Sequence, residues 1–310
     1  MTRKWLAALK GIDWSMIGIL ASIFLIWQIG LSFHWDKKAW LLLLVCLIGV
    51  RKYANKQMSP YFFAVVVPTL VVFYFVSKSG PGFWWGIADS LFKNSKHIWV
   101  WDDFMRSIPL NDAAWARFFH WDTLDYYMRW IYNLGFVLPL WLGIIYCVFS
   151  GRLADMFRFV LSGHIMQLPL ILPFYNLILL REVWWVKGQP DLLLREFADE
   201  NAKLVTVMNC FPSMHTSIAF AMMLLALRQK DPVFKWVMAV YCGSIIWSTL
   251  YLQIHWVLDL FAGMLFAYGV VKLADGIVYL VKEKLMPARV KQAWQAPQPK
   301  PELGAATTTV

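Results

Sequence analysis

Long apolar runs, separated by shorter polar segments, account for most of this 310-residue chain. A transmembrane helix needs roughly 17–25 predominantly apolar residues, and the pattern predicts eight such helices. Their expected ranges are 12–33, 39–53, 61–77, 129–149, 156–180, 213–228, 233–254 and 256–281. The second is the shortest, because only residues 39–50 are strictly apolar, and a re-entrant segment is its alternative. The pattern therefore predicts an all-α, polytopic membrane helical bundle of about eight transmembrane helices.

The composition agrees with a chain that lies in a bilayer. Hydrophobic residues make up 60% of the sequence and charged residues 15%, whereas soluble domains carry roughly 25% charged residues. The net charge of +10 raises the question of nucleic acid as a partner. No basic run is interleaved with stacking aromatic residues outside the apolar segments, so we expect no nucleic-acid partner.

The basic residues instead predict the orientation of the chain, because cytoplasmic loops carry an excess of Lys and Arg. With a cytoplasmic N-terminus, the inner segments contain the following basic residues: Arg3, Lys4, Lys10, Arg51, Lys52, Lys56, Arg152, Arg158, Arg228, Lys230, Lys235, Lys282, Lys284, Arg289 and Lys291. The long outer loops, 78–128 and 181–212, are slightly acidic, and only Lys37 and Lys38 lie on the unexpected side. We expect an integral membrane protein with both termini in the cytoplasm.

The first polar stretch whose side chains could take part in a reaction is NCFPSMHTS at residues 209–217, directly before an apolar run. Pro212 marks a helix start, and unpaired N–H groups at a helix N-terminus suit an anionic phosphate. Ser213 adds a hydroxyl donor, and His215 is expected within the first turn. Taken alone, a histidine at this position would ordinarily be interpreted as a residue that caps the helix or packs against its neighbours.

The second stretch is STLYLQIHWVLD at residues 248–259. His255 and Asp259 are four residues apart, so on a helix they share a face and can hydrogen-bond. A carboxylate on one ring nitrogen fixes the tautomer and leaves the other nitrogen as a nucleophile. Ser248 would lie two turns before His255 if the helix continued.

The expected topology places both stretches at the same outer membrane face. Two histidines, one carboxylate and two serines beside a helix N-terminus are what phosphoryl transfer through a phosphohistidine needs. One histidine attacks phosphorus, the carboxylate orients it, and the second histidine protonates the leaving oxygen.

At this point the chain resembles the type 2 phosphatidic acid phosphatase superfamily. FPSMH at 211–215 and YLQIHWVLD at 251–259 look like its second and third motifs. STLYL at 248–252, with Asp125, Tyr132 and Pro139, resembles the inositol phosphorylceramide synthase branch, which transfers phosphoinositol onto ceramide. The resemblance implies a six-helix phosphatase-type core within the bundle.

The resemblance also implies roles for individual residues. His255 would be the nucleophile, Asp259 its orienting partner and His215 the general acid, while Ser213 and Ser248 would lie at the phosphate. Thr249 stands where the phosphatases carry Arg, a loss that the synthase branch shares and that favours transfer of a phosphodiester headgroup. The first motif is not clearly present; Arg181 is its candidate cation, and anchoring of a helix end beside Glu182 is the alternative.

The chain is accordingly expected to have three parts. Residues 1–60 form an N-terminal pair of spans, and residues 61–281 form the phosphatase-type membrane domain, with the motifs within about 120–270. Residues 282–310 are predicted to be a disordered cytoplasmic tail, because the segment after 287 is rich in Pro, Ala, Gln and Thr. No CxxC pair and no cage of ligands is evident, so we expect neither a metal nor a cofactor.

The favoured function is that of a lipid phosphotransferase with its active site on the extracytoplasmic or lumenal face. Its partners would be a phospholipid substrate and a lipid acceptor. The first alternative is a lipid phosphate phosphatase that acts on phosphatidic acid or a polyprenyl diphosphate. The second is a non-enzymatic lipid transporter, which polar residues in the middle of spans would favour; here they cluster at one face.

Overall fold

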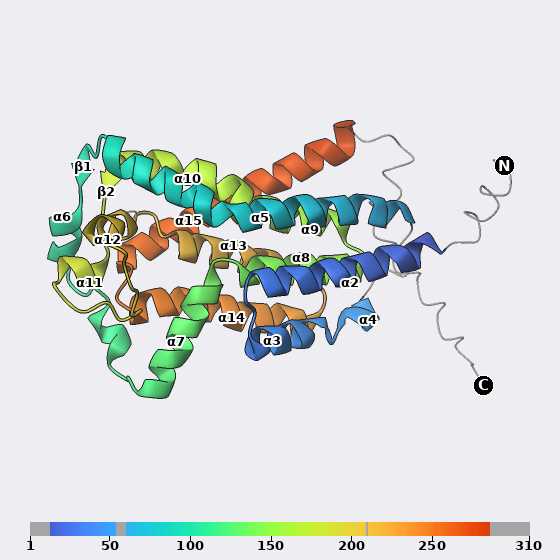
Figure 1. Ribbon diagram of the computed structural model, residues 1–310, viewed down its shortest axis with the longest axis horizontal. Helices are drawn as coiled ribbons and strands as arrows, with labels where there is room; N and C mark the ends of the chain where they lie inside the picture. Colours follow the sequence, from blue (N-terminus) through green and yellow to red (C-terminus); the bar gives the residue numbers. More distant parts are fainter. Residues whose placement is uncertain (1–12, 54–59, 209, 286–310) are drawn as a thin grey trace, which may run out of the picture.

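The computed structural model describes residues 13–53, 60–208 and 210–285 and consists almost entirely of helices (Figure 1). The α-helices are α2 (Trp14–Ser32), α3 (Lys37–Leu47), α4 (Val50–Tyr53), α5 (Pro60–Asn94), α6 (Asp102–Ser107), α7 (Asp122–Gly135), α8 (Leu138–Ser150), α9 (Leu153–Val160), α10 (Met166–Leu177), α11 (Val183–Val186), α12 (Glu200–Val207), α13 (Met214–Leu227), α14 (Pro232–Tyr251) and α15 (Val257–Leu280). Shorter elements are η1 (Ala114–Arg117), η2 (Leu161–Ile165), η3 (Val281–Leu285), β1 (Trp99–Val100) and β2 (Ile178–Leu179).

The long apolar helices confirm an all-α membrane bundle. Among the described residues, five helical stretches are long and apolar enough to cross a membrane: Ser15–Ser32, Tyr61–Asn94, Leu153–Leu177, Pro232–Tyr251 and Val257–Lys284. The pair α7 and α8 makes a sixth if it is one span bent by 62°. The eight predicted ranges fall largely on helices, but several of these helices are short, with 11 residues in α3, 13 in α8 and 14 each in α7 and α13.

The predicted C-terminal ends of the third and last spans differ from the structure. The span expected to end at residue 77 continues as α5 to Asn94, through Pro68 and Pro81. The continuation is held by packing, since Trp84 meets the ring of Tyr175 edge-on at 6.0 Å and Ala88 is buried. At the C-terminal end, residues 281–285 prolong α15 as η3. The rest of the predicted tail lies outside the described residues.

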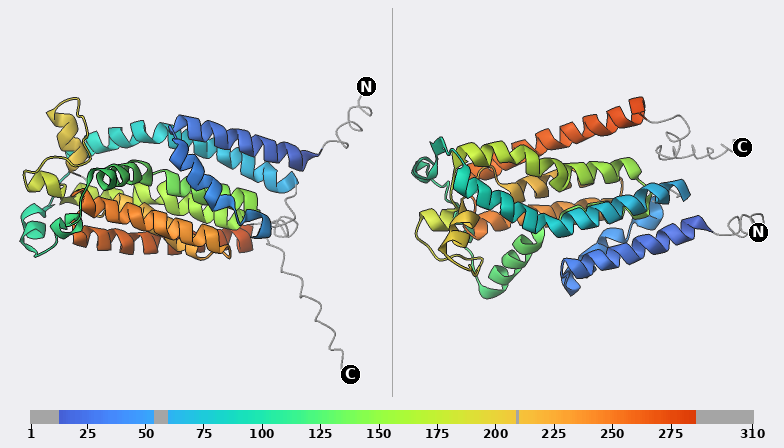
Figure 2. Two further views of the ribbon diagram at one scale, coloured as in Figure 1. Left: turned by 90° about the horizontal axis from the view of Figure 1, so that it is seen from below. Right: turned by 45° about the horizontal axis from the view of Figure 1, so that its top comes forward.

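Helix α13 forms the centre of the bundle and packs against α14 and α15 (Figures 1 and 2). Its residues are apolar or small on all sides, including Ala219, Ala221 and Ala226, which are fully buried. A helix that is hydrophobic all round must be surrounded by other elements, and small residues let neighbouring helices approach closely. The residue before this helix, Ser213, is consequently brought into the middle of the bundle end.

The short elements α6, α11, α12, β1 and β2 gather at one end of the bundle (Figure 1). Strands β1 and β2 pair in parallel, with Trp99 opposite Ile178. At the same end, Glu182 N–H donates to Val207 O and Val183 N–H donates to Ile254 O. These hydrogen bonds tie the segment after α10 to the turn between α14 and α15, where the second chemical motif lies.

Candidate active site

His255 lies in the turn between α14 and α15 rather than on a helix. Helix α14 ends at Tyr251, and Gln253 adopts a left-handed backbone with φ of 56°. The N–H groups of Ile254 and His255 both donate to the carbonyl of Thr249, at 3.0 and 3.2 Å. The continuous helical stripe considered for residues 248–255 is therefore wrong, because the chain leaves the helix four residues before His255.

Asp259, in the first turn of α15, reaches back to His255. The distance between Nδ1 of His255 and Oδ2 of Asp259 is 2.6 Å, and both residues are buried, at 5% and 0% exposure. The hydrogen bond engages Nδ1, so Nε2 is the ring nitrogen left for a substrate. The second carboxylate oxygen, Oδ1, is buried without a hydrogen-bond partner among the described residues.

Cys210 completes this cluster. Its thiol lies 3.2 Å from Nδ1 of His255 and donates to Oδ2 of Asp259 at 3.4 Å. Burial, and then the charge of Asp259, raise the pKa of the Cys210 thiol well above its usual value, so the thiol stays protonated. The sequence contains no CxxC pair, and its motifs assigned no role to Cys210.

The same cluster bears on metal binding, because the ligand atoms of Cys210, His255 and Asp259 lie within 4.8 Å of one another. A Cys, a His and an Asp are donors that suit Zn²⁺. A metal, however, needs the thiolate form and would compete for the Nδ1 nitrogen that Asp259 holds. The arrangement fits a hydrogen-bonded His–Asp pair better than a resident ion, and the absence of a metal stays a prediction.

The first turn of α13 carries the other two motif residues. Ser213 is the N-cap; its Oγ accepts from the N–H of Thr216 at 3.3 Å and donates to Thr216 Oγ1 at 3.0 Å. His215 stacks on Tyr132 of α7, with ring centroids 4.2 Å apart and an interplanar angle of 21°. The rings of His215 and His255 are separated by 6.4 Å between centroids. The fold thus brings both histidines to one place.

Gly263 allows α15 to approach the start of α13. A Cβ atom at this position would lie 2.7 Å from the backbone oxygen of Ser213. Gly263→Ala is expected to force the two helices apart, at about 1–3 kcal/mol, and to lower turnover by displacing His215 from His255. Thermal unfolding and turnover in detergent measure both effects. Gly269→Ala, in the same helix but with open space at its Cβ, is the matched control and should change neither; an unaltered Gly263→Ala variant would contradict the prediction.

Ser248 and Thr249 are buried, and their hydroxyls are used within α14. Ser248 Oγ donates to Ile245 O at 2.7 Å, and Thr249 Oγ1 donates to Ile246 O at 2.8 Å. Such bonds to the preceding turn are common for hydroxyl side chains in helices. Both hydroxyls therefore donate to carbonyls of their own helix, so neither proton is directed at a substrate.

Arg181 forms an ion pair with Asp102 of α6, with Nε 2.6 Å from Oδ2 and its backbone N–H 2.8 Å from Oδ1. Its carbonyl accepts from Nε1 of Trp256 at 2.9 Å. The residue therefore links α6 to the start of α15, next to His255. Helix anchoring, the alternative for Arg181, involves Asp102 rather than Glu182.

Arg195 is a partly buried cation that sequence reasoning missed. Its guanidinium pairs with Glu182, at 2.9 Å for Nη1 to Oε1, and with Asp191, at 2.7 Å for Nε to Oδ2. Burial lowers the pKa of Arg195, but the Glu182 charge more than offsets this, so the net pKa is raised and the charge is retained. The available signal was an unexplained Arg in the outer loop 181–212.

Labelling of the cysteines tests whether a reagent can reach the buried thiols, including that of Cys210 beside His255. Cys46, Cys147, Cys210 and Cys242 are all buried, and only thiolates react readily with alkylating reagents. We expect the folded protein in detergent at pH 8 to take up less than about one-tenth of an iodoacetamide label per chain, and to take up four labels after denaturation. Mass spectrometry counts the labels. Rapid modification of Cys210 in the folded protein would contradict the closed arrangement.

The part of the chain that contains this cluster is similar to a known protein family. The family model of the PAP2 superfamily matches residues 178–283, about a third of the chain, a range that contains His215, His255 and Asp259. No curated protein and no solved structure matches the chain. Members of this superfamily are phosphatases or phosphotransferases. The matched segment carries the His–His–Asp cluster and lies in a bundle of long apolar helices, so the chain is a membrane enzyme, a phosphatase or phosphotransferase, with a segment similar to the PAP2 superfamily.

Proposed function

We propose that this enzyme is a lipid phosphotransferase that resembles inositol phosphorylceramide synthase. It would cleave a phospholipid phosphoester through a phosphohistidine and pass the phospho-headgroup to a lipid hydroxyl. The observation that supports this most directly is the pair of histidine rings 6.4 Å apart, one of them held by a buried carboxylate.

The proposed reaction has two steps. In the first, Nε2 of His255 attacks phosphorus and forms a P–N bond, while the P–O bond to the lipid breaks and His215 gives its proton to the leaving oxygen. In the second, His215 takes the proton of the acceptor hydroxyl, whose oxygen attacks phosphorus and displaces Nε2. Asp259 holds the Nδ1 proton throughout and stabilises the charged ring.

A lipid hydroxyl, such as that of ceramide, is the proposed acceptor because this site has few cations for a phosphate monoester. Thr249 occupies the position of the phosphatase arginine, and its buried side chain bonds to its own helix. A phosphodiester carries one charge less and needs fewer cations. If water were the acceptor, the same cluster would hydrolyse phosphatidic acid or a polyprenyl diphosphate.

The remaining assignments are part of this proposal. Ser213, at the N-terminus of α13, and Arg181 would contact the phosphate, and the cluster would face the extracytoplasmic or lumenal side with both termini in the cytoplasm. Residues 61–281 would form the catalytic membrane domain and residues 1–60 an addition to it. In the described part, α2 packs along α5, with a hydrogen bond of 2.8 Å between Ser32 and Tyr74.

The test is a transfer assay with purified protein in vesicles. Phosphatidylinositol labelled in the inositol ring is supplied with and without ceramide, and labelled lipid and water-soluble products are separated. The proposal expects a new labelled lipid only when ceramide is present. Release of water-soluble label alone, at a rate that ceramide does not change, would overturn transfer and favour hydrolysis. A parallel reaction with phosphatidic acid measures phosphatase activity directly.

A further inference from the structure

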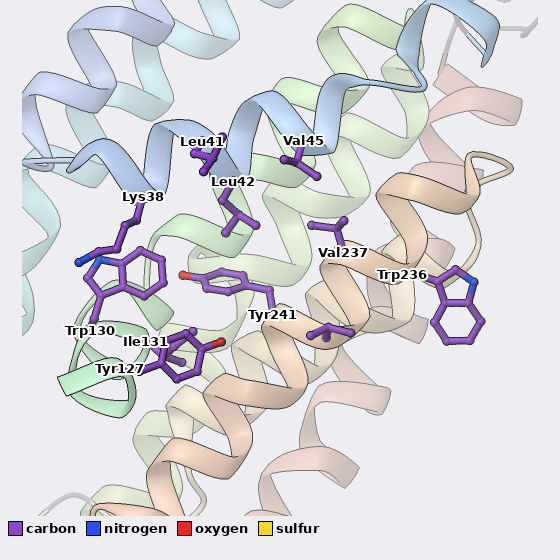
Figure 3. Close-up of a pocket in the computed structure, with 11 residues that line it drawn as sticks. Lys38, Leu41, Leu42, Val45, Tyr127, Trp130, Ile131, Trp236, Val237 and Tyr241 are labelled. Atoms are coloured by element: carbon purple, nitrogen blue, oxygen red, sulfur yellow. The ribbon is translucent and has the colours of Figure 1, made fainter. Parts of the chain in front are cut away.

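A groove on the side of the bundle lies between α3, α7 and α14, away from the histidine cluster (Figure 3). Its cavity volume is about 530 Å³, within the range of roughly 300–1,000 Å³ that small-molecule sites occupy. The lining residues are Lys38, Leu41, Leu42, Val45, Tyr127, Trp130, Ile131, Trp236, Val237, Val240 and Tyr241.

The groove is apolar and belongs to a surface that faces lipid. Lys38 is its only charged lining residue among the described part of the chain. Around it, Leu41, Trp236 and Val240 are 61%, 64% and 66% exposed, which a helix can tolerate when its surroundings are hydrocarbon. A hydrocarbon chain is therefore the kind of ligand that the walls of the groove would take.

One end of the groove is polar and carries the ammonium group of Lys38. Lys38 Nζ lies 3.1 Å from Asp36 and donates to the hydroxyl of Tyr126 at 2.7 Å. An ammonium group has three donors, so one is left for another acceptor. Asp36 also accepts from Nε1 of Trp130 at 3.0 Å, so Lys38 is not its only partner, and Lys37 beside it is exposed outside the lining. These lysines are the two that lie on the unexpected side by loop charge.

Tyr241 adds a second polar group. The residue is 4% exposed, and its hydroxyl is buried with no hydrogen-bond partner among the described residues. Figure 3 shows this ring pointing toward the end of the groove where Lys38 and Trp130 lie. An unsatisfied buried hydroxyl is costly, and an ester or hydroxyl oxygen of a ligand could satisfy it after a small shift.

We propose that this groove binds one anionic phospholipid, with a hydrocarbon chain between α3 and α14 and the phosphate at Lys38. The site is separate from the candidate active site but shares α7 with it. Ile131 lines the groove, and the next residue, Tyr132, stacks on His215. A bound lipid would thus hold α7 in the position that supports His215.

Native mass spectrometry of the full chain in detergent tests this proposal. The protein is titrated with phosphatidylglycerol and, separately, with phosphatidylcholine of identical chains. We expect the wild type to retain one phosphatidylglycerol about fivefold more tightly than phosphatidylcholine, the size of effect that one lysine has on an anionic lipid. Lys38→Ala should remove this preference. Lys37→Ala, which alters an exposed neighbour outside the lining, is the matched control and should keep it.

Filling the groove with a larger side chain tests whether the hydrocarbon chain of the lipid binds there. Val240→Trp should abolish tight retention of both lipids; because Val240 is exposed, the larger side chain need not disturb the core. An unchanged unfolding temperature checks the fold. Equal binding of both lipids by the wild type, or unchanged binding by Lys38→Ala and Val240→Trp, would overturn the site. His255→Ala should bind phosphatidylglycerol like the wild type, so that failure of the proposed enzymatic function remains distinguishable from failure of this site.

Discussion

Replacing His255 with alanine is expected to reduce turnover by a factor on the order of 10⁴ or more, since catalytic nucleophiles and their bases act as a unit. The imidazole is held by Asp259 at 2.6 Å through Nδ1, which leaves Nε2 for the proposed attack on phosphorus. Alanine removes the atom that would form the P–N bond. The remaining polar groups could still bind phosphate, so we expect substrate binding to persist while the chemical step is lost.

The measurement for His255 combines turnover with covalent trapping. Rapid quenching at alkaline pH, with a substrate labelled at phosphorus, should reveal a labelled wild-type protein and an unlabelled His255→Ala variant. Ser248→Ala is the control, because the Ser248 hydroxyl bonds to its own helix; it should keep turnover within about threefold of wild type, as expected for the loss of one modest hydrogen bond. Normal turnover in His255→Ala would remove the nucleophile assignment and, with it, the phosphohistidine.

Replacing His215 with alanine is expected to lower turnover of a natural lipid substrate about 10²–10⁴-fold, the usual contribution of general acid catalysis. His215 lies with its ring centroid 6.4 Å from that of His255 and is stacked on Tyr132. In this position it can protonate a leaving oxygen on the phosphorus that His255 attacks. The loss of turnover in His215→Ala should therefore be larger for a leaving group that must be protonated than for one that departs as a stable anion.

A p-nitrophenyl ester separates this role from a structural one. Its leaving group departs as a stable anion, so His215→Ala should lose far less activity on this substrate than on a lipid, whereas His255→Ala should be inactive on both. The matched control is Tyr132→Phe, which keeps the aromatic ring that stacks on His215. Equal losses of His215→Ala on both substrates would contradict a general acid and indicate that the residue only positions other groups.

The positions of the polar residues favour an enzyme over a transporter. Several ion pairs lie at the end of the bundle that carries the histidines, such as Arg181–Asp102 and Arg195–Glu182. Others lie on α9 and α15, where Asp275 pairs with Arg158 and Arg228. The described spans place the His–Asp pair at a helix start rather than along a path between helices, which is the arrangement expected of a site for chemistry.

The amino-acid sequence alone determined the fold class and the chemical motifs. Apolar runs long enough for a bilayer predict helices, since lipid offers no other partner for backbone N–H and C=O groups. The four-residue spacing of His255 and Asp259 brought them within reach of each other even though His255 lies in a turn, because α15 begins two residues after His255 and Asp259 lies in its first turn. Both features depend on local geometry, which short stretches of sequence encode.

Only the tertiary structure decided which groups surround the motifs. Cys210 lies beside His255 and Asp259, and Arg195 pairs with Glu182, because separate loops converge at one bundle end. The same folding uses the hydroxyls of Ser248 and Thr249 within α14 and pairs Arg181 with Asp102. The contacts of Cys210 with His255 and of Arg181 with Asp102 join residues tens of positions apart, and they depend on packing that no local pattern specifies.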